Sequence, residues 1–173
     1  MNLIAGADLA SRTLDPGKFV AFVGGRLKSL FVKSDQDLGA RLSTLDERRD
    51  PDARFRVNEF FCQNDTWQTT LQQLLRRSEV VLMDLRGFCA TNSGCLFELK
   101  QLADHHLLPR TLFIVDEATD VPLLETTVRN QIAEKPGTHQ ASTELSLNLA
   151  KVSSQSAAEL SRIAHALHAL VAG

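Results

Sequence analysis

The sequence lacks the features that define several large classes of protein. No apolar run approaches the ~18 residues of a membrane-spanning helix, and residues 1–15 lack the basic start and apolar core of a signal peptide. The three cysteines, Cys62, Cys89 and Cys95, form no CxxC pair, which argues against a structural zinc site and a disulfide framework. The net charge of −2 gives no basic footprint for nucleic acid. We therefore expect a protein of the reducing cytoplasm with no metal, cofactor or nucleic-acid partner.

Two nucleotide-binding motifs are absent as well. The sequence contains neither GxGxxG nor GxxxxGK[ST], so the Rossmann and P-loop sites that these motifs form have no support. What is present is the composition of an ordinary globular protein, with 43% apolar and 23% charged residues. A length of 173 residues suits one hydrophobic core, and we expect a single domain over residues 1–173.

Helix and strand patterns alternate through most of the chain. Residues 1–50 predict a strand at 2–5 and helices at 15–31 and 34–45, followed by a charged loop at 46–53. Residues 54–173 predict strands at 55–61, 80–85, 111–115 and 143–152, and helices at 65–77, 93–106, 120–133 and from 154 onward. Such alternation predicts a three-layer α/β fold, with a mostly parallel sheet of four or five strands and helices on both faces. The last strand alternates in polarity, so we expect it near an edge of the sheet.

Three of the predicted strands end in polar loops, at residues 62–65, 84–94 and 116–120. In an open parallel sheet the carboxyl ends of the strands lie at one edge, and ligands bind outside that edge. The segment 78–102, which reads as a strand, a polar turn and a helix, is therefore expected at the centre of a ligand site.

Five residues of this segment are candidates for ligand binding, and each has a local alternative. Asp84 could accept a hydrogen bond from a ribose hydroxyl, with Arg86 beside it, or the two could form a local ion pair. Asn92, Ser93 and Gly94 begin a helix, where free backbone amides suit a phosphate or carboxylate group. Alternatively, Asn92 or Ser93 only caps the helix.

Two further acids are expected near the same edge. Glu98 either faces the site, where burial would raise its pKa and suit acid–base or cation-stabilising chemistry, or is a surface acid favoured by the helix dipole. Asp116 follows the strand at 111–115 and is a candidate ligand-binding residue. Asp116 and Asp120 could also bind magnesium, although Asp120 is more simply the cap of the next helix. Cys95 reads as a packing residue, because no histidine stands in a partner role.

The runs NLIAGADLA, RFRVNEFFCQNDTW, VVLMDLRGF, GCLFEL and VDEATD resemble a group of uncharacterised bacterial proteins. In that group a soluble C-terminal domain follows predicted membrane helices, and the resemblance covers nearly the whole chain. It implies that the natural protein begins earlier, with a further strand and a membrane anchor, which fits a strand that starts at Asn2. The domain would then lie at the cytoplasmic face of a membrane.

A second resemblance is to the flavodoxin-like fold of TIR domains and nucleoside deoxyribosyltransferases. Residues 95–99, CLFEL, match the C-x-x-E-L part of the TIR helix pattern, although Gly94 stands where that pattern has Trp. The resemblance implies that Glu98 is the catalytic residue of any NAD-cleaving or nucleoside-cleaving activity. Asp84 and Arg86 would then position the ribose, and the turn at 92–94 would bind phosphate.

Three functions are consistent with these observations. The first is a nucleotide-binding or signalling domain of TIR-like or flavodoxin-like fold, natively attached to a membrane segment. The second is an enzyme that cleaves an N-glycosidic bond of NAD or a nucleoside. The third is a protein-interaction module that uses the helices of residues 15–45. The sequence leaves open whether there is turnover, which ligand is bound, and the oligomeric state.

Overall fold

The computed structural model describes residues 2–5, 30–45, 58–63, 65–133, 146–153 and 156–172. The chain divides into two compact units, Met1–Leu74 and Leu75–Gly173, and each is described by itself. Both units are of the α/β class, and every strand among these residues pairs in parallel, as the alternating sequence pattern predicts.

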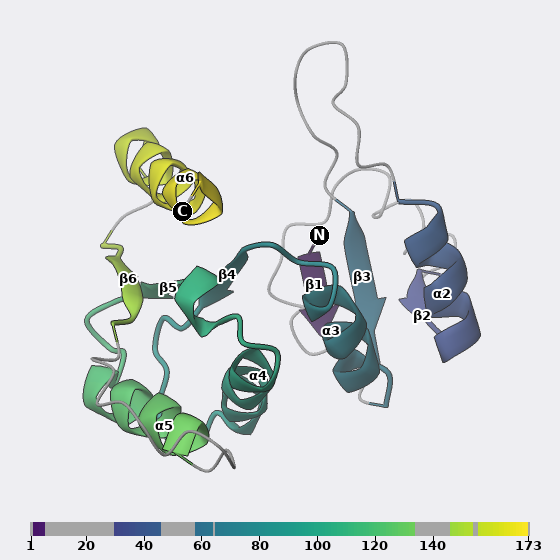
Figure 1. Ribbon diagram of the computed structural model, residues 1–173, viewed down its shortest axis with the longest axis horizontal. Coiled ribbons are helices and arrows are strands. Elements are labelled where there is room, and N and C mark those ends of the chain that lie inside the picture. Colours follow the sequence, from purple (N-terminus) through teal and green to yellow (C-terminus); the bar gives the residue numbers. More distant parts are fainter. Residues whose placement is uncertain are drawn as a thin grey trace, which may run out of the picture. The chain divides into compact units, whose positions relative to one another are not determined.

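The first unit is a small parallel sheet with two described helices (Figure 1). Its elements are β1 (Asn2–Ala5), β2 (Phe31–Val32), α2 (Asp35–Ser43), β3 (Glu59–Cys62) and α3 (Trp67–Leu75). The strand order is β1-β3-β2, so β3 lies in the centre. The core of this unit joins the sheet to α2 and α3 through Val32, Leu38, Leu42, Phe60, Cys62 and Leu74.

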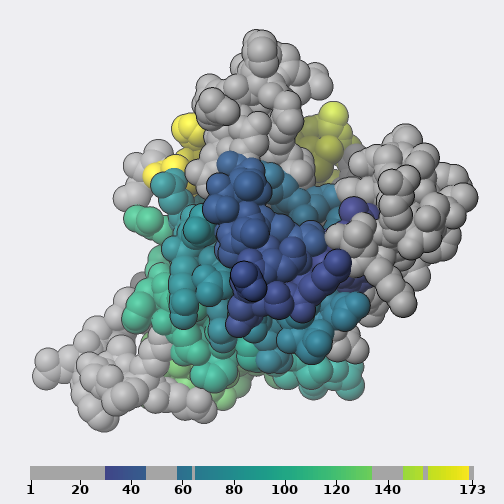
Figure 2. All heavy atoms as spheres, turned by 90° about the vertical axis from the view of Figure 1, so that its right-hand side faces the viewer, coloured from purple at the N-terminus to yellow at the C-terminus, as the bar shows by residue number. Residues whose placement is uncertain are grey.

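Helix α2 forms where the sequence places a strong start signal. The Ser34 side chain accepts a hydrogen bond from the backbone N–H of Asp37 at 3.2 Å, which caps the first turn. Leu38 and Leu42, four residues apart, face the core and are almost fully buried. The outer side of α2, which faces the viewer in Figure 2, carries polar or small residues such as Gln36, Gly39 and Ser43.

The second unit is a three-stranded parallel sheet of order β4-β5-β6 with helices on both faces. Its elements are β4 (Val81–Asp84), α4 (Ser93–Asp104), the short 3₁₀ helix η3 (Leu108–Arg110), β5 (Thr111–Val115), α5 (Val121–Ala133), β6 (Asn148–Lys151) and α6 (Ala157–Ala172). Figure 1 shows α4 and α5 on one side of the sheet and α6 on the other.

Burial follows this layered arrangement. All five residues of β5 are buried, because helices cover both faces of the central strand. The edge strands are more open: Leu82 of β4 is 50% exposed and Leu149 of β6 is 39% exposed. Leu99 of α4 and Leu124 of α5 are completely buried, and these two helices pack against each other. Placement of β6 at an edge confirms the expectation from its alternating sequence.

Helix α4 ends in a Schellman motif, in which two backbone bonds close the last turn. The N–H of Leu107 donates to the carbonyl of Leu102 at 2.9 Å, and the N–H of His106 donates to the carbonyl of Ala103 at 3.1 Å. His106 occupies the left-handed position with φ 58°, and it is the only non-glycine residue with positive φ in the described part of the chain. Leu102 and Leu107 are both buried, which supplies the hydrophobic contact of the motif.

The predicted fold class is confirmed, with two differences in detail. The strands form two sheets of three rather than one sheet of four or five. Phe31, which the apolar spacing assigns to the end of a helix, lies instead in β2, where it pairs with Phe61 of β3 and their ring centroids are 6.2 Å apart. The rest of the predicted helix at 15–31 and the loop at 46–53 lie outside the described residues. The single domain over residues 1–173 stays a prediction, since the two units are described separately.

Candidate functional site

The candidate site lies at the carboxyl ends of β4 and β5, within the second unit. The two strands pair in parallel, and the N–H of Leu85 donates to the carbonyl of Ile114 at 2.8 Å, which extends their pairing beyond β4. The polar loops at 84–92 and 116–120 therefore leave the sheet side by side. The third polar loop predicted from sequence, at 62–65, follows β3 and belongs to the other sheet.

Asp84 and Arg86 form an ion pair at this edge. The Arg86 Nε donates to both carboxylate oxygens of Asp84, at 2.9 and 3.1 Å, and Nη2 donates to Oδ2 at 2.5 Å. The hydrogen bonds from the Arg86 guanidinium lower the pKa of Asp84, and the same pairing raises the pKa of Arg86. The side chains are 42% (Arg86) and 53% (Asp84) exposed, so both are open to a ligand.

The Asp116 carboxylate joins the two loops instead of pointing freely outward. Its Oδ1 accepts hydrogen bonds from the backbone N–H of Gly87 at 2.9 Å, from the Thr119 hydroxyl at 2.9 Å and from the N–H of Ala118 at 3.1 Å. These bonds, that from Gly87 foremost, lower the pKa of Asp116. Gly87 has φ +68°, a conformation that strains other residues, so the sharp turn after β4 requires glycine here.

Thr119 also bonds the two loops together where Asp116 joins them, a region that we call the Asp116 junction. The sequence did not predict this role of Thr119. Its hydroxyl lies 2.9 Å from the carbonyl of Leu85 and accepts a hydrogen bond from the N–H of Asp116 at 3.0 Å. The N–H of Asp120 also donates to the carbonyl of Phe88 across the junction, at 2.9 Å. The three-residue spacing from Asp116 to Thr119 was a usable signal, because Asp and Thr at such spacing commonly bond to nearby loop amides.

The start of α4 lacks the side-chain cap that was the alternative interpretation of Asn92 and Ser93. Asn92 occupies the N-cap position, but its side chain makes no capping hydrogen bond. Its Oδ1 accepts instead from the backbone N–H of Cys89 at 2.8 Å. The amide of Gly94 has no hydrogen-bond partner in the part of the chain that the structure describes, and the space around Gly94 is open. The N–H of Ser93 donates to the carbonyl of Thr91 at 3.0 Å, so the amide of the exposed Gly94 is the group of this turn that can receive an anion.

Cys89 is a second feature of the site that the sequence reasoning overlooked. The thiol is exposed, lies 3.1 Å from the Thr91 hydroxyl and donates to Asn92 Oδ1 at 3.2 Å. The hydrogen bond with Thr91 lowers the pKa of Cys89 below its usual range. By contrast Cys62, in the first unit, is buried, and burial raises its pKa.

Glu98 is half-buried and lies on the covered side of α4. It follows Cys95 by three residues and precedes Gln101 and Leu102 by three and four, and these spacings place all four on one side of a helix. Gln101 and Leu102 are buried, and Cys95 is half-buried. Glu98 thus differs from Lys100 and Asp104, which are exposed and form an ion pair at 3.1 Å. The role of Glu98 in the site stays a prediction.

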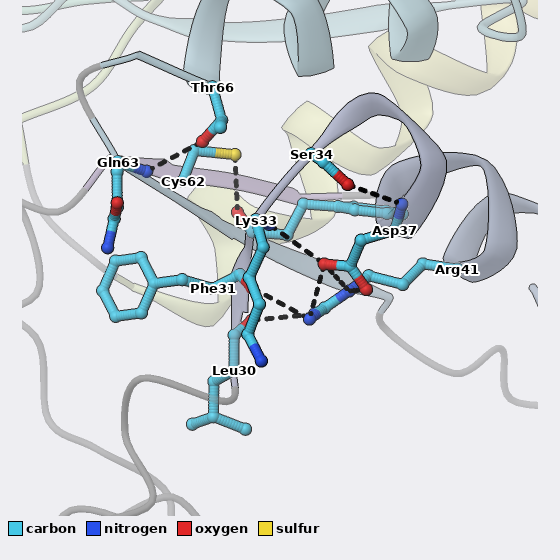
Figure 3. A network of polar contacts seen from close by, with 10 residues as sticks. Leu30, Phe31, Lys33, Ser34, Asp37, Arg41, Cys62, Gln63 and Thr66 are labelled. Atoms are coloured by element: carbon cyan, nitrogen blue, oxygen red, sulfur yellow. Dashed lines mark hydrogen bonds and ion pairs between the residues drawn. The ribbon is translucent and has the colours of Figure 1, made fainter.

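The polar residues at the carboxyl ends of the first unit's strands make local contacts (Figure 3). The Arg41 guanidinium pairs with Asp37 at 3.2 Å and donates to the carbonyls of Leu30 and Phe31 at 2.8 and 2.9 Å. These contacts tie α2 to the start of β2. They explain Asp37 and Arg41 as parts of the fold of this unit.

Searches for related proteins do not identify this chain. No family model, curated protein or solved structure matches it. Among the described residues, no group of three or more His, Cys, Asp and Glu side chains could hold a metal ion. None of the helices in the described ranges has the length and apolar character needed to cross a membrane.

Proposed function

We propose that this chain is a nucleotide-binding or signalling domain of TIR-like or flavodoxin-like type, with its ligand at the carboxyl ends of β4 and β5. The observation that carries the proposal is the uncapped first turn of α4, in which the exposed amide of Gly94 has no partner in the described part of the chain. Backbone amides at a helix N-terminus bind phosphate, because the amide donors and the helix dipole both favour an anion.

The ion pair at the end of β4 supplies the second recognition element. Arg86 can donate to a phosphate and Asp84 can accept from ribose hydroxyls, once a ligand replaces part of their mutual pairing. An exposed ion pair contributes only about 0–1 kcal/mol, so rearranging it costs little. The Asp116 junction then holds the β4–α4 loop in place while the ligand binds.

The cellular setting of the proposal comes from the resemblance to bacterial proteins with predicted membrane helices. In this setting the domain works in the cytoplasm, at the membrane face, where the natural protein continues upstream into a membrane segment. The interaction-module alternative depends on residues 15–45. The outer side of α2, within that range, is polar and offers a partner little apolar surface.

Binding is tested by calorimetric titration with ADP, ADP-ribose and adenosine. If the α4 amides bind phosphate, ADP and ADP-ribose bind at least about tenfold more tightly than adenosine, a difference of about 1.4 kcal/mol. Arg86→Met and Asp84→Asn weaken binding. As controls, Lys100→Met and Asp104→Asn remove a comparably exposed ion pair within α4 and leave binding unchanged. Equal affinity for ADP and adenosine, or equal effects of both pairs of variants, would show that the proposed site is wrong.

The second candidate is an enzyme that cleaves an N-glycosidic bond of NAD or a nucleoside. The half-buried position of Glu98 on the covered side of α4 favours it, since a carboxylate shielded from water stabilises a developing oxocarbenium charge strongly. Incubation with NAD and a nucleoside panel should then yield free base with the parent chain and none with Glu98→Gln. Glu125→Gln changes an exposed acid on α5 and serves as the control. Product formed equally by all three proteins would exclude catalysis by Glu98.

A further inference from the structure

The carboxyl end of β6 brings a third loop to the edge where the candidate site lies. Val115 of β5 pairs with Lys151 of β6, and the N–H of Val152 donates to the carbonyl of Val115 at 2.9 Å, so the two strands end side by side. Figure 1 shows α5 and α6 on opposite sides of the sheet, so the loops after β5 and β6 diverge. Diverging loops leave the strand ends between them accessible, and open α/β sheets bind ligands at such places.

The Lys151 side chain reaches from the end of β6 to the β5–α5 loop. Its Nζ lies 3.2 Å from Oε1 of Glu117, the residue that follows Asp116. Asp116 in turn accepts a hydrogen bond from the N–H of Gly87 at 2.9 Å, and Gly87 follows Arg86 in the β4–α4 loop. This chain of contacts places the Lys151 ammonium at the border of the candidate site.

The ion pair of Lys151 and Glu117 is open to exchange. The two side chains are 65% and 71% exposed, and neither has another hydrogen-bond or ion-pair partner in the part of the chain that the structure describes. Such an exposed pair contributes little to stability, so an anionic ligand can take the place of Glu117 at small cost. Arg162 of α6 donates to the carbonyl of Lys151 at 2.7 Å, which holds the end of β6 while the side chain changes partner.

The charges at this edge make a second cation necessary for a ligand with several phosphate groups. The carboxylates of Asp84, Asp116 and Glu117 all lie in the loops at this edge, and they repel added negative charge. The guanidinium of Arg86 already donates three hydrogen bonds to Asp84. The ammonium of Lys151 is paired only with an exposed acid, and an ammonium binds phosphate as a compact point charge.

We propose that Lys151 binds a second phosphate group of the ligand, so that the site takes nucleoside diphosphates in preference to monophosphates. The inference rests on the proposed function, in which the first turn of α4 binds one phosphate. On binding, the ammonium of Lys151 leaves the carboxylate of Glu117 and contacts the added phosphate. The sequence analysis did not single out Lys151, because its place at the edge depends on the pairing of β6 with β5.

Calorimetric titration with AMP and ADP, in a buffer without divalent cations, tests the role of Lys151. The parent chain should bind ADP at least about fivefold more tightly than AMP. Lys151→Met should leave the affinity for AMP nearly unchanged and bring the affinity for ADP down to it. Arg110→Met is the matched control, because Arg110 is an exposed cation directly before β5, at the opposite edge of the sheet, and its loss should not alter the ratio.

Glu117→Gln provides a second test with the opposite sign. It removes the carboxylate that competes for Lys151, so it should strengthen the binding of ADP more than that of AMP, whereas a purely structural ion pair would leave the ratio unchanged. Binding of neither AMP nor ADP to the parent would overturn the proposed function, and this inference with it. Equal binding of the two, or the parent's preference for ADP in Lys151→Met, would overturn the inference alone.

Discussion

Thr119→Val tests whether the junction between the two site loops stabilises the fold. The Thr119 hydroxyl has one proton, which it donates either to the carbonyl of Leu85 or to the carboxylate of Asp116, both at 2.9 Å. The same oxygen accepts from the N–H of Asp116 at 3.0 Å. Valine has nearly the same shape but neither capacity, so the substitution removes one donated and one accepted hydrogen bond without opening a cavity.

The expected cost follows from these two bonds. A hydrogen bond of this kind contributes about 0.5–1.5 kcal/mol net, and Thr119 is half-buried, so water replaces the lost bonds only in part. We expect Thr119→Val to lower the free energy of unfolding by about 1–2 kcal/mol. With a urea slope of about 1–3 kcal/mol/M, the midpoint should fall by roughly 0.3–2 M.

The measurement is urea unfolding followed by circular dichroism, with Thr126→Val as the matched control. Thr126 is exposed on α5 and donates only to the carbonyl of Pro122 within its own helix, at 2.8 Å. Its replacement should change the free energy of unfolding by less than about 0.5 kcal/mol. If Thr119→Val is no more destabilising than Thr126→Val, the loops are not held by this hydroxyl and the reasoning is refuted.

Three other predictions follow from single residues. His106→Gly should raise the free energy of unfolding by about 0.5–1 kcal/mol, because glycine adopts the left-handed φ of 58° without steric cost. A lower unfolding temperature of the variant, measured by thermal unfolding, would count against the Schellman motif. Carbon-13 NMR should show the Asp84 carboxyl titrating below its ordinary pKa of 3.8, and Arg86→Met should move this titration midpoint upward. The stabilisation from the ion pair is then present above pH 3.8 and is lost as the pH falls through the lowered pKa. An unchanged midpoint in Arg86→Met would contradict this. Iodoacetamide should label Cys89 before the other cysteines, and the pH midpoint of its labelling rate should lie below the ordinary thiol pKa. Thr91→Val should raise this midpoint. Preferential labelling of another cysteine would show that the hydrogen bond between Cys89 and Thr91 is not formed in solution.

Much of the fold was readable from the sequence because its signals are local. The apolar run of β5 predicts a strand with the same bounds as the structure, Thr111–Val115, and Ser34 and Asp120 begin helices as capping residues do. The division of the strands into two sheets was not readable. Hydrogen bonding between strands depends on contacts far apart in the chain, and the short β2 has too few residues to show a strand pattern.

The adjacency of the two loops of the candidate site was predictable from the sequence, but the contacts between them were not. Parallel topology brings the loops after β4 and β5 to one edge, and that expectation required no side-chain knowledge. The role of Asp116 as a bridge to Gly87 depends on where two loops meet in space, which the sequence does not encode locally. The redirected side chain of Asn92, which leaves the start of α4 uncapped, likewise depends on the loop conformation around Cys89.

The central claim is that the first turn of α4 binds the phosphate of a nucleotide, and an amide NMR titration tests it most directly. Addition of ADP should shift the amide resonances of Ser93 and Gly94 in a saturable way, and Arg86→Met should require more ADP for the same shift. Gly39, an exposed glycine within α2, is the internal control and should not respond. No shift at Gly94 up to millimolar ADP, or a shift no larger than that of Gly39, would contradict the account.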